Sequence, residues 1–214
     1  MTDARPRRSA LYVPGANARA LEKVPGLDAD VVIVDLEDAV APAAKEAARA
    51  GAVDAIRRGL GRAEVVLRVN GVGTPWGEAD LAAAARSGAD AVLLPKVEDP
   101  GTVREAERRL AAAGAPDAQA LRAMVEPPRG VLRAADVAAA SPRLACLVAG
   151  TSDLVKDLRA RHTPGRVEVL ASLSLVVLAA RACGLAALDG VHLDLADDAG
   201  FEAACQQGRD LGFD

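Results

Sequence analysis

Short apolar runs recur along the chain, and longer segments rich in alanine and arginine separate them. Seven such runs occupy residues 9–14, 31–37, 64–70, 91–97, 120–126, 144–150 and 188–194. They are continuously apolar rather than alternating, which is typical of strands covered on both faces of a parallel sheet. The segments between them show helical patterns. The chain is therefore predicted to repeat a strand and a helix seven times.

Two parallel architectures fit this repeat: a doubly wound open sheet and a closed (β/α)₈ TIM barrel. A dinucleotide-binding open sheet usually carries a G-x-G-x-x-G turn after its first strand, and VPGANARA lacks it. A barrel needs an eighth strand and typically about 250 residues, whereas this sequence stops at LGFD, where that strand would begin. We therefore predict a TIM barrel whose eighth strand and C-terminal segment are missing from this chain.

Glycine and proline mark the joints between the predicted elements, and no linker or change of composition interrupts them. The whole chain, residues 1–214, is accordingly predicted to form one TIM-barrel catalytic domain that is incomplete at its C-terminal end.

Composition excludes several classes of protein. The formal net charge is -4 and aromatic residues make up 2% of the chain, without a basic block, so a nucleic-acid surface is not expected. No apolar segment has the length of a membrane span or of a signal peptide. The three cysteines are widely spaced, which does not indicate a disulfide framework. We expect a soluble cytoplasmic protein.

Polar and charged residues stand at the carboxyl ends of the predicted strands, where parallel folds place their reactive groups. These residues are Glu37, Asp38, Arg68, Asn70, Lys96, Glu126, Asp153, His192 and Asp194. Such charges are costly unless partners or a ligand compensate them. Several carboxylates at one edge favour Mg²⁺ as the ligand, with spare acids pairing with Arg68 or Lys96. The lack of a histidine or cysteine cluster argues against zinc.

The chain resembles the citrate lyase β-subunit-like proteins of the HpcH/HpaI aldolase superfamily. The resemblance is carried, in order, by RSALYVPGANARALEKV, VVIVDLEDAV, LRVNG, AVLLPKVE, MVEPPRG, VAGTSDL and LDGVHLD. It covers nearly the whole chain, and the combination of LEDAV, RVN and LPKVE is specific. The chain departs from the family pattern where Pro127 follows Glu126, where Ser152 precedes Asp153, and in lacking the C-terminal lid.

The resemblance implies a (β/α)₈ barrel that binds Mg²⁺ and makes or breaks a carbon–carbon bond beside a coenzyme A thioester, usually as a homo-oligomer and often as a trimer. By motif position, Glu126 and Asp153 match the two metal carboxylates. Arg68 matches the arginine that binds the substrate's carboxylate and oxo group, and Glu126 is also expected to bind the substrate. Glu37 and Asp38 match an acidic pair near the metal waters, and either is a candidate base.

The function predicted from this resemblance is a Mg²⁺-dependent carbon–carbon lyase. It would split a malyl-, citramalyl- or citryl-like CoA thioester into an acyl-CoA and a 2-oxo acid. Three alternatives stay open: an acyl-CoA thioester hydrolase, a CoA-independent 2-oxo-acid aldolase, and a non-catalytic subunit that binds an acyl thioester.

Overall fold

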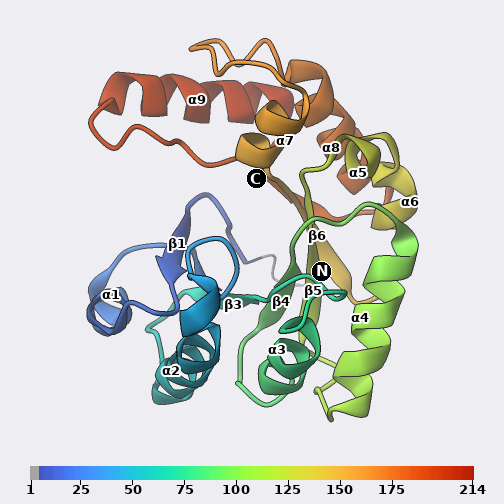
Figure 1. Cartoon of the computed structure of the whole chain (residues 1–214). Coiled ribbons are helices and arrows are strands. Elements are labelled where there is room, and N and C mark those ends of the chain that lie inside the picture. Colours follow the sequence, from blue (N-terminus) through green and yellow to red (C-terminus); the bar gives the residue numbers. More distant parts are fainter. Residues whose placement is uncertain (1–4) are drawn as a thin grey trace. The chain divides into compact units, whose positions relative to one another are not determined.

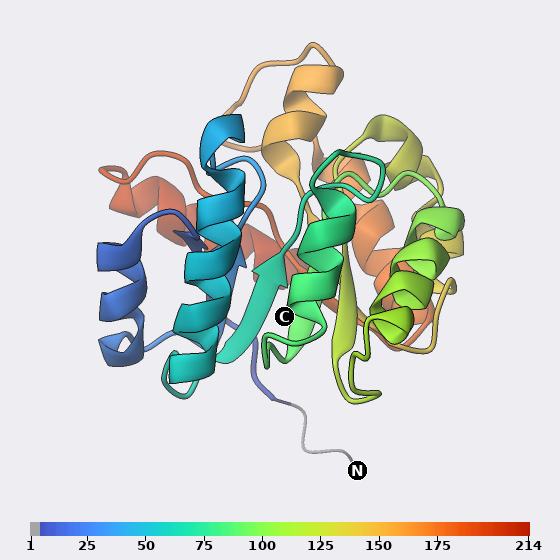
Figure 2. The same ribbon diagram turned by 60° about the horizontal axis from the view of Figure 1, so that its bottom comes forward.

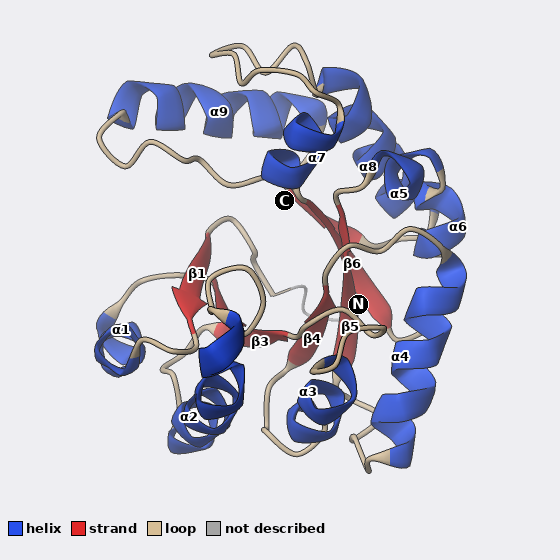
Figure 3. Ribbon diagram, viewed as in Figure 1, coloured by secondary structure: helices blue, strands red, loops and turns tan. Residues whose placement is uncertain are grey.

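The computed structural model describes residues 5–214, so the first four residues of the predicted domain lie outside the described part. Strands and helices alternate along the chain (Figure 3). The strands are β1 Ala10–Pro14, β2 Val31–Asp35, β3 Glu64–Arg68, β4 Ala91–Leu94, β5 Ala120–Val125, β6 Leu144–Ala149 and β7 Ala186–Leu188. Six of the seven predicted strands lie where they were expected, and the seven observed strands form one sheet in the order of the sequence.

The prediction of a TIM barrel that lacks its eighth strand is wrong. The sheet is open, with β1 and β7 as its edges, and within residues 5–214 no strand joins the two. Closure needs every strand to pair on both sides. After β7 the chain instead forms helix α9, Asp198–Leu211, whose backbone groups pair within the helix.

The last predicted strand is displaced. Residues 188–194 were expected to form it, but β7 ends at Leu188, so His192 and Asp194 lie in the following loop. Asp189 follows the strand directly, and its carboxylate accepts hydrogen bonds from Arg166, from Nη1 at 2.9 Å and from Nη2 at 2.8 Å. The apolar side chains that suggested a strand here are largely exposed, Val191 by 47% and Leu193 by 60%.

The other helices connect consecutive strands. They are α1 Ala18–Lys23, α2 Lys45–Arg58, α3 Gly77–Ala84, α4 Pro100–Ala112, α5 Pro128–Leu132, α6 Ala134–Ala138, α7 Thr151–Asp157 and α8 Leu170–Ala182, with short 3-10 turns at Val24–Gly26 and Pro42–Ala44. No helix in the described residues is long and apolar enough to cross a membrane.

The described chain groups into two compact units. The first runs up to Pro95 and includes Arg104–Arg122, and the second comprises Lys96–Val103 and Ala123–Asp214. In the first unit, α1 packs on α2 and α2 on α3, and the three helices lie side by side on one face of the strands (Figures 1 and 2). In the second unit, α8 packs on α6 and on strands β6 and β7.

Register decides which side chains meet at the strand ends of the first unit. Asp35, the last residue of β2, is the partner of Arg68, the last residue of β3. The partner of Asp35 on its other side is Pro14, which places Tyr12 one pleat earlier on the same face. The charged ends of β2 and β3 are therefore neighbours on one face of the sheet.

Candidate functional site

Arg68 is held in the first unit by a buried ion pair with Asp35. Its Nε donates to Asp35 Oδ1 at 2.6 Å and its Nη2 donates to Oδ2 at 2.7 Å. The Asp35 side chain is 1% exposed and that of Arg68 is 9% exposed. Burial by itself would lower the pKa of Arg68, but the hydrogen bonds and charge of Asp35 outweigh burial and raise that pKa. Arg68 therefore stays charged in a fixed orientation.

The acidic pair after β2 faces the same guanidinium. Arg68 Nη1 lies 3.2 Å from Glu37 Oε2 and 3.6 Å from Asp38 Oδ2. Asp35 also shapes the turn that carries these acids, because its two carboxylate oxygens accept the backbone N–H groups of Glu37 at 2.8 Å and Ala39 at 2.9 Å. Tyr12 adds its ring to this cluster, 5.2 Å from the guanidinium carbon.

Two residues from outside the strand support this turn. Lys45, at the start of α2, donates from Nζ to the carbonyls of Leu36 and Glu37, both at 3.0 Å. Asn70, just after β3, donates from Nδ2 to the Leu36 carbonyl at 3.0 Å. The backbone that positions Glu37 is thus fixed from two directions.

Asp80, on α3, orients Asn70 in turn. Its side chain is fully buried and its Oδ2 accepts the backbone N–H of Asn70 at 2.9 Å and the side-chain Nδ2 at 2.6 Å. Arg49 neutralises it from α2, with Nε 2.5 Å from Oδ1. Helices α2 and α3 therefore help to fix the turn beside Arg68.

The two predicted metal carboxylates lie in the second unit, and both contact Lys96. Glu126 follows β5 and is 3% exposed; its Oε1 accepts the backbone N–H of Lys96 at 2.7 Å. Asp153 is in the first turn of α7, and its Oδ2 lies 3.3 Å from Lys96 Nζ. One residue therefore links the carboxylates that follow β5 and β6.

Gly150 brings the start of α7 against Glu126. A Cβ atom at Gly150 would overlap the Glu126 side chain, with Oε2 at 2.6 Å and Cδ at 3.1 Å. Since Gly150 caps α7 and Asp153 is three residues further on, this close approach requires glycine and brings the helix carrying Asp153 up to Glu126.

The donor set fits a hard divalent cation. Two carboxylates are present, and Mg²⁺ in proteins is usually held by one or two carboxylates, with waters and substrate oxygens as the remaining ligands. No group of three or more histidine, cysteine, aspartate or glutamate side chains in residues 5–214 is arranged to hold a metal ion. The site therefore suits magnesium better than zinc, which prefers a fuller set of protein ligands.

Three other residues considered from the sequence make local contacts away from Glu126 and Arg68. Asp194 Oδ1 accepts the backbone N–H of Ala196 at 3.0 Å, as a turn residue does. The ring of His192 packs edge-on against Phe201 at 5.7 Å. Arg129, an alternative partner for Glu126, lies 3.7 Å from Glu98 instead.

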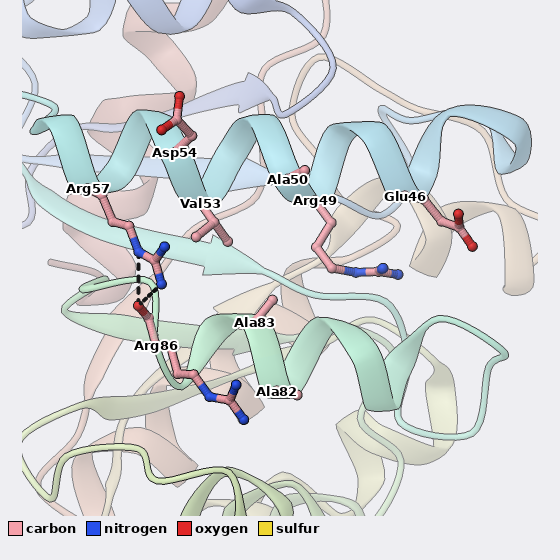
Figure 4. A pocket seen from close by; sticks show the side chains of 9 residues that line it. All are labelled: Glu46, Arg49, Ala50, Val53, Asp54, Arg57, Ala82, Ala83 and Arg86. Atoms are coloured by element: carbon pink, nitrogen blue, oxygen red, sulfur yellow. Dashed lines mark hydrogen bonds between the residues drawn. The ribbon is translucent and has the colours of Figure 1, made fainter.

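A hollow on the surface of the first unit lies elsewhere. It is lined by side chains of α2 and by residues at the end of α3, and Figure 4 shows Arg57 donating to the Arg86 carbonyl across it. None of the predicted site residues lines it, and its Arg49 is already paired with Asp80. We therefore base the candidate site on the strand ends.

Three residues that organise the site were not selected from the sequence. Asp35 could have been found, because it and Arg68 are each the fifth residue of a predicted strand, 31–37 and 64–70, and neighbouring strands in equal register place them side by side. Lys45 and Asp80 carried no such signal, since charged residues on amphipathic helices usually face solvent.

The chain is similar in sequence to two groups of known proteins. The chain is 48% identical over 212 residues to the (3S)-malyl-CoA thioesterase of Cereibacter sphaeroides, covering 99% of this chain and 72% of that protein. It is 38% identical over 216 residues to the citrate lyase subunit beta of Escherichia coli, covering 98% and 72%.

A solved structure extends the comparison to the fold. The citrate lyase beta subunit of M. tuberculosis, complexed with oxaloacetate and magnesium, superposes with a TM-score of 0.79 at 34% identity, covering 96% of this chain and 87% of that one. The model of the HpcH/HpaI aldolase/citrate lyase family matches residues 8–214. The chain therefore belongs to the HpcH/HpaI aldolase/citrate lyase family.

Proposed function

We propose that this chain is a magnesium-dependent enzyme that cleaves the carbon–carbon bond of a malyl-, citramalyl- or citryl-like CoA thioester, giving an acyl-CoA and a 2-oxo acid. The observation that carries the proposal is the pair Glu126 and Asp153, linked through Lys96 in a member of this family. The substrate class is supported by relatives named for malyl-CoA and citrate, and by a solved relative that holds oxaloacetate, a 2-oxo acid.

Glu126 and Asp153 are the residues that would hold the metal. When bound, Mg²⁺ supplies Lewis-acid polarisation of the oxygens of a 2-oxo or 3-hydroxy acid. Glu126 also keeps its hydrogen bond to the Lys96 backbone, which orients the carboxylate before any ion binds. This supports a preformed site rather than one assembled by the ligand.

Arg68 is assigned to the substrate's carboxylate and to the oxygen that becomes the oxo group. A guanidinium suits this role because its N–H groups donate charge-assisted hydrogen bonds to a carboxylate and stabilise developing negative charge. Asp35 takes the donors at Nε and Nη2 and fixes the plane of the group. We therefore assign the Nη1 side, which faces Glu37 and Asp38, to the substrate.

Glu37 and Asp38 are the candidate bases. In cleavage, a carboxylate removes the hydroxyl proton and the O–H electrons form the carbonyl of the 2-oxo acid. The electrons of the broken carbon–carbon bond remain on the α-carbon of the acyl-CoA, which then takes up a proton. Both acids lie beside the Arg68 guanidinium, next to the group that is assigned to the substrate's oxygens.

Hydrolysis of the thioester is the second candidate, favoured by the 48% identity to a malyl-CoA thioesterase. There, water adds to the thioester carbonyl, the carbon–sulfur bond breaks, and the products are a free hydroxy acid and coenzyme A. The same substrate class serves both reactions, so the products separate them.

The test incubates the purified chain with Mg²⁺ and either malyl-, citramalyl- or citryl-CoA or a free hydroxy-oxo acid, and identifies the products by mass spectrometry. Acyl-CoA with glyoxylate, pyruvate or oxaloacetate supports carbon–carbon cleavage. Free hydroxy acid with coenzyme A supports hydrolysis. Cleavage of a free hydroxy-oxo acid without any action on CoA thioesters would support the CoA-independent aldolase and overturn the proposal. No turnover, with thioester binding intact, would support the non-catalytic subunit.

The proposal includes two further features of this protein as predictions: assembly into a homo-oligomer, with a trimer favoured, and a cytoplasmic location. Analytical ultracentrifugation measures the first, and fractionation of cells that express the protein measures the second.

A further inference from the structure

Lys96 has an unusual backbone conformation. It follows β4 with φ at 50°, in the left-handed region that residues with a Cβ atom rarely adopt. In this conformation its backbone N–H points at Glu126 Oε1, 2.7 Å away. Such a conformation persists only where surrounding interactions hold it, and it often marks a functional site.

The side chain of the same residue reaches the second carboxylate. Lys96 Nζ lies 3.3 Å from Asp153 Oδ2, where it is 44% exposed and Asp153 is 26% exposed. A positive charge therefore sits beside a carboxylate that is assigned to the metal. An ammonium and a divalent cation at one carboxylate repel each other.

We propose that Lys96 is a positioning residue of the metal site with two opposed effects, an inference that rests on the proposed function. Its backbone N–H orients Glu126 for the ion, whereas its ammonium neutralises Asp153 in the metal-free protein and competes with the ion for that carboxylate. Lys96 thereby keeps the site ordered without metal and sets its affinity lower than the carboxylates alone would give.

The substitution Lys96→Gly isolates the ammonium. Glycine adopts a positive φ without strain and keeps the backbone N–H that Glu126 accepts, so the loop geometry is retained. We expect Mg²⁺ and Mn²⁺ to bind about three- to tenfold more tightly than to the wild type, as removal of a partly exposed charge predicts. Lys96→Met, which removes the charge but keeps the side-chain bulk, is expected to change affinity in the same direction.

Lys156 provides a matched control. Its Nζ lies 4.0 Å from Oδ1 of the same Asp153, but its side chain is 78% exposed on α7. Lys156→Met is expected to change metal affinity less than about twofold, because water and salt screen an exposed charge. Lys96→Arg, which keeps a cation, is expected to leave affinity near the wild-type value.

The measurement is isothermal titration of Mg²⁺, checked by electron paramagnetic resonance of Mn²⁺, with no substrate present. Unchanged or weaker binding in Lys96→Gly and Lys96→Met would overturn the inference. A further variant, Glu126→Gln, distinguishes an error in the role of Lys96 from an error in the proposed metal site. If it binds metal like the wild type, the metal site itself is misassigned; if it loses binding while Lys96→Gly matches the wild type, only the role of Lys96 is refuted.

Discussion

Asp35 is the residue that defines the Arg68 cluster. The sequence pointed to Glu37 and Asp38 as the acids that would pair with Arg68 or Lys96, and the structure pairs both with Arg68. Asp35, however, makes the two-point contact and also accepts the backbone of the turn that carries the other acids. One buried carboxylate thus sets the orientation of both the cation and the acidic pair.

Replacing Asp35 by asparagine is expected to lower the free energy of unfolding by about 3 to 5 kcal/mol, because it removes the charge that makes the two-point contact with a buried guanidinium. Urea denaturation measures the change. Asp54→Asn is the matched control: Asp54 pairs with Arg58 where both side chains are more than 60% exposed, and a change within about 0.5 kcal/mol is expected. Equal effects of the two substitutions would contradict the role given to Asp35.

A second buried carboxylate, Glu64 at the start of β3, predicts a pH dependence of stability. Burial by itself would raise its pKa, but hydrogen bonds and charges from Arg7 and Arg122 outweigh burial and place the pKa below the ordinary 4.5. A lowered folded-state pKa means that this pairing stabilises the fold above pH 4.5. The contribution is lost as pH falls through the folded-state pKa.

Arg7→Met is therefore expected to cost about 1 to 3 kcal/mol of stability at pH 7, and the deficit is expected to shrink as pH falls below 4.5. Urea unfolding at a series of pH values checks this. Arg8→Met is the control, because Arg8 is 76% exposed in its pair with Asp30. A deficit that stays constant with pH would show that Arg7 acts through packing rather than through the Glu64 charge.

At the scale of the elements, the connection between β6 and α7 places the start of α7 against Glu126. Gly150 has a φ of -98°, which any residue tolerates, so the need for glycine is purely steric. The chain passes so close to Glu126 that a methyl group has no space. The sequence flagged VAGTSDL as a family motif, but the contact between its glycine and a residue on the preceding strand end could not be inferred from that pattern.

Gly150→Ala is expected to displace the Glu126 carboxylate and weaken Mn²⁺ binding by at least about tenfold. Its cost in stability is expected to be about 1 to 3 kcal/mol, as for other overpacked sites. Gly26→Ala is the control, because a Cβ there meets nothing within 4 Å. Metal binding by Gly150→Ala at the wild-type affinity would show that Glu126 is not held in place by this contact.

At the scale of the whole molecule, the open sheet has an edge at β7 that the C-terminal residue partly covers. The backbone N–H of Asp214 donates to the Ala187 carbonyl at 3.0 Å, and Asp214 Oδ2 accepts the Ala187 N–H at 2.7 Å. Arg181 Nη1 lies 2.9 Å from the same oxygen. In the described residues no further strand pairs with this edge. Asp214 therefore supplies the hydrogen-bond partners for the backbone of Ala187.

Asp214→Ala is expected to lower the free energy of unfolding by about 1 to 2 kcal/mol, because the buried Ala187 N–H loses its acceptor. Chemical denaturation measures it. Asp210→Ala is the control. Among the interactions described, the exposed Asp210 carboxylate accepts one side-chain hydrogen bond, from Gln206 at 2.7 Å. Its removal is expected to change the free energy of unfolding by less than about 0.5 kcal/mol. Similar losses in both would mean that the edge contact adds no stability of its own.

Hydrophobic patterning is a local property, so the residues alone were sufficient to predict seven strands, the alternation with helices and the charged strand ends. The same residues misplaced the last strand, because the apolar side chains of Val191 and Leu193 suggested a buried strand although they are exposed. They also predicted a TIM barrel that lacks its eighth strand, whereas the sheet is open. Whether a sheet forms a barrel depends on how its two edge strands are placed, and that is not a local property. Strand register brings Asp35 to Arg68, and backbone dihedrals bring Lys96 to Glu126. Such contacts join residues 30 or more positions apart, and their existence depends on three-dimensional geometry that no local pattern encodes.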